Sequence, residues 1–79
     1  MRIDKFLKVS RIIKRRTLAS EACDREKVFI NGRVAKAGSQ VKEGDIVEIR
    51  FGEQVTRFRV LKTTEHAKKE ESADMYELL

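Results

Sequence analysis

The chain has 79 residues, with 18 Lys or Arg, 13 Asp or Glu, a formal net charge of +5 and a single Cys. A chain of this length forms one small domain that cannot easily supply both a core and a deep substrate cavity, which argues against most enzymes built on large pockets. Because no apolar run approaches the roughly 18 residues of a membrane span or resembles a signal peptide, we expect a cytoplasmic protein with no membrane contact.

The positive charge is concentrated in the first half of the chain. Residues 1–36 carry eleven Lys or Arg and four Asp or Glu, whereas residues 37–79 carry seven and nine. Seven of the first sixteen residues are basic, and Asp4 is the only acid among them. Like charges at helical spacing repel unless a polyanion lies opposite, so this run predicts a polyanionic partner. A basic surface that faces only water is the alternative.

Two short amphipathic helices are predicted at the start of the chain. Ile3, Phe6 and Leu7 follow the i, i+3, i+4 pattern of one helical face over residues 3–9. A second apolar stripe predicts a helix over about residues 15–25. The members of this stripe are Leu18, Ala19, Ala22 and Cys23. Neither helix is stable alone at this length, so both must pack on the segments that follow.

A small, mainly antiparallel sheet is predicted next. Asn31-Gly32, the strongest short hairpin signal, lies within the β-branched and aromatic segment 28–35. In residues 46–51, apolar Val47, Ile49 and Phe51 alternate with charged residues, as in a half-buried strand. A second hairpin leads into a strand over residues 55–61. Its predicted inward residues are Thr56, Phe58 and Val60, and its outward residues are Arg57 and Arg59.

The last segment differs in composition from the rest of the chain. Residues 63–79 have a net charge of −3 and few apolar residues before Met75. We therefore divide the chain into a domain over 1–62 and an acidic C-terminal tail over 63–79 that is mobile or helical. The predicted fold class is α+β, with two short basic helices packed on a small antiparallel sheet.

No cluster of residues predicts catalysis, a metal site or a cofactor. His66, the only histidine, lies in a polar stretch and is expected to be solvated. Cys23 has no second cysteine for an internal disulfide, so we expect a small buried hydrophobic residue. The glycines are scattered at turns rather than clustered in a phosphate-binding loop. We therefore expect a binding protein and not an enzyme.

Several motifs, in this order and spacing, resemble the S4-type RNA-binding domain over about residues 1–51. They are Arg2–Leu7, Arg16–Ala19, Val28–Gly32 and Val41–Ile46. The resemblance implies two helices on a small sheet, with a basic face that grips structured RNA. The chain departs from the family pattern at Glu26-Lys27, where members usually have a glycine after the second helix, and at Arg15, where a serine is common.

Within this family the chain is most similar to the RqcP group, which is related to heat-shock protein fifteen. The similarity rests on Asp4–Arg11, on Lys14–Ala19 and on Lys68–Tyr76. It implies a cofactor of bacterial ribosome-associated quality control that binds the large ribosomal subunit obstructed by peptidyl-tRNA. Such a cofactor contacts ribosomal RNA and tRNA and supports C-terminal alanine tailing of the stalled chain, together with the factor that recruits alanyl-tRNA. We expect a ribosome-associated monomer.

The predicted RNA contacts form two sets. The first set, which we call the basic face, consists of Arg2, Lys5, Lys8, Arg11, Lys14, Arg15 and Arg16. The second set consists of Lys27, Asn31, Arg33 and Lys36. Binding through phosphates should weaken steeply as the salt concentration rises. The protein should recognise the shape of the RNA rather than its base sequence.

Structural roles are the alternative for several of these residues. Arg2 and Arg16 could pair with Asp4, the lone acid among seven bases, and such a pair could also orient an arginine toward phosphate. Asn31 fits a turn better than a contact. Outside the two sets, Arg57 and Arg59 could simply balance Glu48 across the sheet.

Three functions stay open on the sequence. The first is the quality-control factor, for which Arg16→Glu should abolish ribosome association without unfolding the domain. The second is a general rRNA-binding factor of the heat-shock protein fifteen type, which acts in heat shock or ribosome recycling and binds free rRNA and empty subunits equally well. The third is a protein-interaction adaptor that recruits a partner through the acidic tail and the outer face of the sheet. Binding by an adaptor would survive loss of residues 1–16 and would not depend on the salt concentration.

Overall fold

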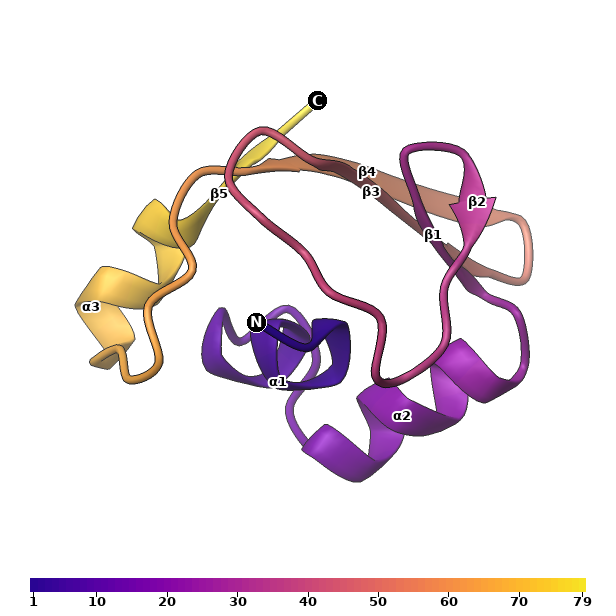
Figure 1. Ribbon diagram of the computed structural model, residues 1–79, viewed down its shortest axis with the longest axis horizontal. Coiled ribbons are helices and arrows are strands. Elements are labelled where there is room, and N and C mark those ends of the chain that lie inside the picture. The colour runs from indigo at the N-terminus through magenta and orange to yellow at the C-terminus, as the bar shows by residue number, and fades with distance from the viewer.

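A five-stranded antiparallel sheet forms one layer of the molecule, and two short helices cover one of its faces (Figure 1). The computed structural model describes residues 1–79. Its elements are α1 (Ile3–Val9), α2 (Arg16–Asp24), β1 (Val28–Ile30), β2 (Arg33–Val34), β3 (Ile46–Phe51), β4 (Gln54–Val60), α3 (Lys69–Ser72), the 3₁₀ helix η1 (Ala73–Met75) and β5 (Tyr76–Leu78). The strand order is β2-β1-β3-β4-β5. The predicted α+β class is confirmed.

The segment 37–41 crosses the start of α1 and holds it in place. The first backbone N–H groups of a helix have no partner within the helix. Here the N–H of Ile3 donates to the carbonyl of Ser39 at 2.7 Å, and the N–H of Asp4 donates to the carbonyl of Ala37 at 3.3 Å. These two bonds therefore fix the first turn of α1 against a loop more than thirty residues later in the chain.

Helix α2 ends in a Schellman motif that lacks the usual glycine. The N–H of Lys27 donates to the carbonyl of Ala22 at 2.9 Å, and the N–H of Glu26 donates to the carbonyl of Cys23 at 3.0 Å. Glu26 adopts a left-handed backbone conformation with φ 60°, which has a lower free-energy cost for glycine than for other residues. The departure from the family pattern thus changes the residue at the end of the helix and leaves the motif intact.

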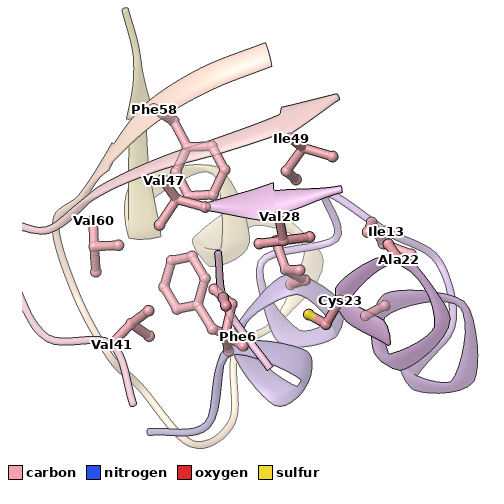
Figure 2. Packing of buried hydrophobic residues seen from close by; sticks show 14 of the residues in the cluster. Phe6, Ile13, Ala22, Cys23, Val28, Val41, Val47, Ile49, Phe58 and Val60 are labelled. Atoms are coloured by element: carbon pink, nitrogen blue, oxygen red, sulfur yellow. The ribbon is translucent and has the colours of Figure 1, made fainter. Parts of the chain in front are cut away.

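The core lies between the two helices and the sheet (Figure 2). The rings of Phe6 on α1 and Phe58 on β4 are fully buried and stack with their centroids 6.0 Å apart. The ring of Tyr76 meets Phe58 edge-on at 5.6 Å. The predicted inward residues that are buried are Ile3, Phe6, Leu7, Ala19, Ala22, Cys23, Val47, Ile49, Phe58 and Val60. Each large apolar side chain among them contributes about 1.5–3 kcal/mol through burial.

The hairpin predicted at Asn31-Gly32 is confirmed. Ile30 of β1 pairs with Arg33 of β2 across the turn. The φ angles are 50° at Asn31 and 82° at Gly32, so both central residues have the positive φ that a tight hairpin turn requires.

Two residues that the sequence places in the core are exposed instead. Leu18 is 49% exposed and Phe51 is 53% exposed. Both border an open apolar hollow beside α2 that Ile13 also lines. The alternation in β3 correctly predicts the face on which Phe51 lies. Its burial was wrongly predicted because Phe51 ends the strand, where α2 covers the sheet only in part.

Residues 63–79 return to the sheet. Helix α3 is the helical part of this segment, and β5 then adds the last strand, with Tyr76 paired to Val60 of β4. Met75 is 1% exposed, and its carbonyl accepts a hydrogen bond from the N–H of Leu61 at 2.8 Å. The acidic segment therefore contributes to the core, while the division of the chain at residue 62 stays a prediction.

Candidate nucleic-acid interface

One buried carboxylate at the start of α1 holds two arginines. Asp4 is 3% exposed. Its Oδ2 accepts a hydrogen bond from Nη2 of Arg2 at 3.1 Å and lies 3.4 Å from Nε of Arg16. Its Oδ1 accepts a bond from the backbone N–H of Lys5 at 2.8 Å. Because Asp4 lies in the first turn, the positive end of α1 also stabilises its charge.

The two guanidinium groups stay accessible while Asp4 orients them. The side chains of Arg2 and Arg16 are 51% and 47% exposed. A guanidinium has five N–H donors, so each group keeps free donors that can bind a phosphate. The predicted pairing of both arginines with Asp4 is confirmed. Their contact with RNA stays a prediction that this geometry permits.

A hollow of about 350 Å³ lies between the end of α1, the connection to α2 and the 63–67 segment. It is lined by Lys8, Val9, Arg11, Lys14, Glu65, His66 and Ala67. Glu65 forms an ion pair with Lys5, which is sixty residues away in the sequence. The hydrogen bond and the charge of Lys5 hold the pKa of Glu65 below its ordinary value, so this carboxylate is ionised at neutral pH. Sequence reasoning missed Glu65 and His66 here, because no sequence signal links them to α1.

Four members of the basic face have no carboxylate within ion-pair distance: Lys8, Arg11, Lys14 and Arg15. All four are exposed. Arg11 follows the end of α1 in a left-handed backbone with φ 63°, and Arg15 precedes α2 in an extended conformation. The basic face thus runs from Arg2, just before α1, through α1 and the connection to the start of α2.

The second predicted set is spread along the molecule. In the view of Figure 1 the turn between β1 and β2 lies at the top, while α1 and α2 lie at the bottom, so Asn31 and Arg33 do not join the basic face. Lys27 lies beyond α2, next to the apolar hollow described above. Lys36 immediately precedes the segment 37–41, in which Gly38 lies beside the guanidinium of Arg2.

The side chain of Asn31 is engaged within the protein. Its Nδ2 donates to Oδ1 of Asp45 at 3.1 Å, and its Oδ1 accepts a hydrogen bond from the N–H of Ile46 at 2.9 Å. These bonds tie the hairpin turn to the start of β3. The turn role that the sequence favours for Asn31 is confirmed.

The outer face of the sheet carries three arginines, and each has a glutamate partner. Arg50 and Arg57 pair with Glu48 at 2.6 Å and 3.0 Å. The hydrogen bond from Arg57, and then the one from Arg50, hold the pKa of Glu48 below its ordinary value. Arg59 pairs instead with Glu77 of β5 at 3.6 Å. The predicted balance with Glu48 is therefore confirmed for Arg57 and wrong for Arg59, because β5 places a glutamate beside it.

No group of three or more His, Cys, Asp or Glu side chains lies close enough together to hold a metal ion. Burial, and then the nearby charges of Asp4 and Asp24, raise the pKa of the Cys23 thiol to about 11, so it is protonated at neutral pH. None of the helices has the length and apolar character needed to cross a bilayer.

Comparison with known proteins gives one consistent result. The S4 domain family profile matches residues 1–47. The "RQC P-site tRNA stabilizing factor" of Halalkalibacterium halodurans is 53% identical over 99% of this chain and 89% of its own length. The Bacillus subtilis protein of the same name is 53% identical over 100% of this chain and 92% of its own. The trimeric structure of Vibrio cholerae heat shock protein 15 matches with a TM-score of 0.90 and 28% identity, over 100% of this chain and 81% of that one.

Proposed function

Because the chain belongs to the S4 domain family and, within it, to the group of RQC P-site tRNA stabilizing factors, we propose that it is an RNA-binding factor of ribosome-associated quality control. Membership of this family and closeness to the RqcP group are as the sequence resemblance predicts. In this proposal the protein binds ribosomal RNA and P-site tRNA and has no catalytic role of its own.

The arrangement around Asp4 is the observation that carries the proposal. Arg2, just before α1, and Arg16, at the start of α2, reach one buried carboxylate, and each arginine side chain remains about half exposed. Rigid guanidinium groups with free donors suit the phosphates of a folded RNA, because little side-chain freedom is lost on binding. The unpaired cations of the basic face would extend this contact along the RNA backbone.

The finer proposal names the target and the complex. The protein binds the large ribosomal subunit that still carries peptidyl-tRNA, acts there as a monomer in the cytoplasm, and supports C-terminal alanine tailing with the factor that recruits alanyl-tRNA. The basic face makes the main RNA contacts, with Lys27, Arg33 and Lys36 as outer contacts. Asn31, whose amide is bonded inside the protein, contributes through the shape of the turn.

Co-sedimentation tests the proposal directly. Purified protein is mixed with empty large subunits and with large subunits carrying peptidyl-tRNA, and binding is measured across a salt series. We expect preference for the subunit with peptidyl-tRNA and a steep loss of binding with salt. The logarithm of the binding constant should fall against the logarithm of the salt concentration with a slope of roughly 0.7–0.9 for each phosphate contact. Absence of binding at physiological salt would contradict the proposal.

A general rRNA-binding factor of the heat-shock protein fifteen type is the second candidate. The likeness of the whole chain to Vibrio cholerae heat shock protein 15, at a TM-score of 0.90, favours it. The same experiment separates the two, because a general factor would bind empty subunits and subunits with peptidyl-tRNA equally well.

A further inference from the structure

The hollow beside α1 combines free cations with one carboxylate that is already paired. Lys8, Arg11 and Lys14 line it without an acidic partner, and His66 adds a ring with polar nitrogens. Only two of its seven lining residues are apolar, so it does not suit an apolar molecule. Its chemistry fits an anion with several oxygen acceptors.

We propose that this hollow holds one phosphate group of the bound RNA backbone, and that Glu65 acts in the free protein as an internal competitor for that phosphate. The inference rests on the proposed RNA-binding function and adds the 63–67 segment to the interface. Glu65 would leave the hollow when the RNA phosphate enters, and Lys5 would then become free to contact the RNA.

The geometry supports an exchange of one anion for another. Glu65 is ionised, lines the same hollow as the three cations, and is held by Lys5 from the neighbouring turn of α1. The side chain of Glu65 is 61% exposed, so its ion pair is a surface pair of small stability that a phosphate can displace. A phosphate would gain the three free cations together with Lys5.

The exchange would make binding selective. An RNA that reaches only Arg2 and Arg16 leaves Glu65 in place and meets its negative charge near the interface. An RNA whose backbone also reaches the hollow displaces Glu65 and gains the three free cations together with Lys5. Glu65 therefore weakens the binding of an RNA that makes only part of the contact, which favours a folded RNA whose backbone reaches the whole face.

A charge-neutral variant tests the competitor role. Binding of a fluorescein-labelled RNA stem-loop is followed by fluorescence anisotropy across a salt series for the wild type, Glu65→Gln and Glu70→Gln. Glu70 is an exposed acid in α3, outside the hollow and without an ion pair, and its variant changes the net charge equally. We expect Glu65→Gln to tighten binding about threefold to tenfold and to steepen the salt slope by roughly one contact. Glu70→Gln should leave the slope unchanged.

The outcomes separate this inference from the proposed function. If the wild type binds the stem-loop but Glu65→Gln behaves like Glu70→Gln, the competitor role is overturned and RNA binding stands. If the wild type does not bind, both fall. NMR shifts of the wild type on adding the stem-loop provide a second readout. We expect the largest changes at Lys14 and at His66, and an unchanged 63–67 segment would overturn the inference even if the affinities agree with it.

Discussion

The basic face on the two helices and the outer face of the sheet both display several arginines, but they pair them differently. On the outer face, Glu48 and Glu77 neutralise Arg50, Arg57 and Arg59. On the basic face, one buried carboxylate holds two guanidinium groups, and four further cations have no acidic partner. In the proposed function, the face that contacts RNA therefore differs from the outer face by its cations without an acidic partner rather than by its number of arginines.

The two carboxylates at the centres of these faces also differ in surroundings. Asp4 is buried and receives a backbone N–H in addition to its arginines, so it is part of the framework of α1. Glu48 lies on the surface of the sheet, where solvent weakens each ion pair. Variants in matched pairs across the two faces can therefore separate framework, binding and surface effects.

The largest expected effect is on the framework that supports the basic face. Phe6→Ala removes the fully buried ring that stacks on Phe58 and should lower the free energy of unfolding by about 3–5 kcal/mol. Phe29→Ala on the outer face removes a half-buried ring beneath Arg50 and should cost only about 1 kcal/mol. Urea unfolding measures both. Equal losses would show that the outer face supports the fold as much as the core does.

Charge reversal tests binding on the two faces. Arg16→Glu should weaken binding to large subunits about a hundredfold, since a lost phosphate contact and a new repulsion each cost about 1.4 kcal/mol. Arg57→Glu changes the net charge equally and also places an acid beside an existing carboxylate partner, yet it should change binding less than threefold. Co-sedimentation measures binding, and circular dichroism confirms folding. A comparable loss for Arg57→Glu would indicate that net charge alone governs binding.

Two left-handed residues separate backbone strain from charge. Glu26→Gly should stabilise the protein by about 1 kcal/mol, because glycine adopts the φ of 60° at less cost. Arg11→Gly relieves the same strain at φ 63° but removes a cation from the basic face. We expect both variants to melt at higher temperature and only Arg11→Gly to bind RNA more weakly. Unchanged binding by Arg11→Gly would remove Arg11 from the interface.

The smallest expected effect concerns acid stability on the outer face. The pKa of Glu48 in the folded protein lies below its ordinary value of 4.5. The ion pairs of Glu48 therefore stabilise the fold at pH values above 4.5, and this stabilisation is lost as the pH falls through the folded pKa. Glu48→Gln should therefore be slightly less stable than the wild type at about pH 7, and this difference should shrink as the pH falls below about 4.5 and through the folded pKa. Urea midpoints across this pH range measure the difference. A difference that persists in acid would contradict the assigned cause.

Local patterns in the sequence were sufficient for most of the fold. The periodicity of Ile3, Phe6 and Leu7 and the Asn31-Gly32 pair each depend on neighbours within a few residues, and α1 and the first hairpin form as predicted. The exposure of Leu18 and Phe51 could not be predicted in this way. Periodicity identifies the face on which a side chain lies, and the neighbouring element decides whether that face is covered.

The site shows the same division between local and long-range information. The first sixteen residues by themselves determine the cluster of cations, and the lone Asp4 among them predicts its two arginine partners. Only the tertiary structure decides that Glu65 and His66 lie beside Lys8, Arg11 and Lys14, that β5 completes the sheet, and that Arg59 pairs with Glu77. These contacts join segments far apart in the chain, and they depend on how the helices and strands pack together, which no local pattern records.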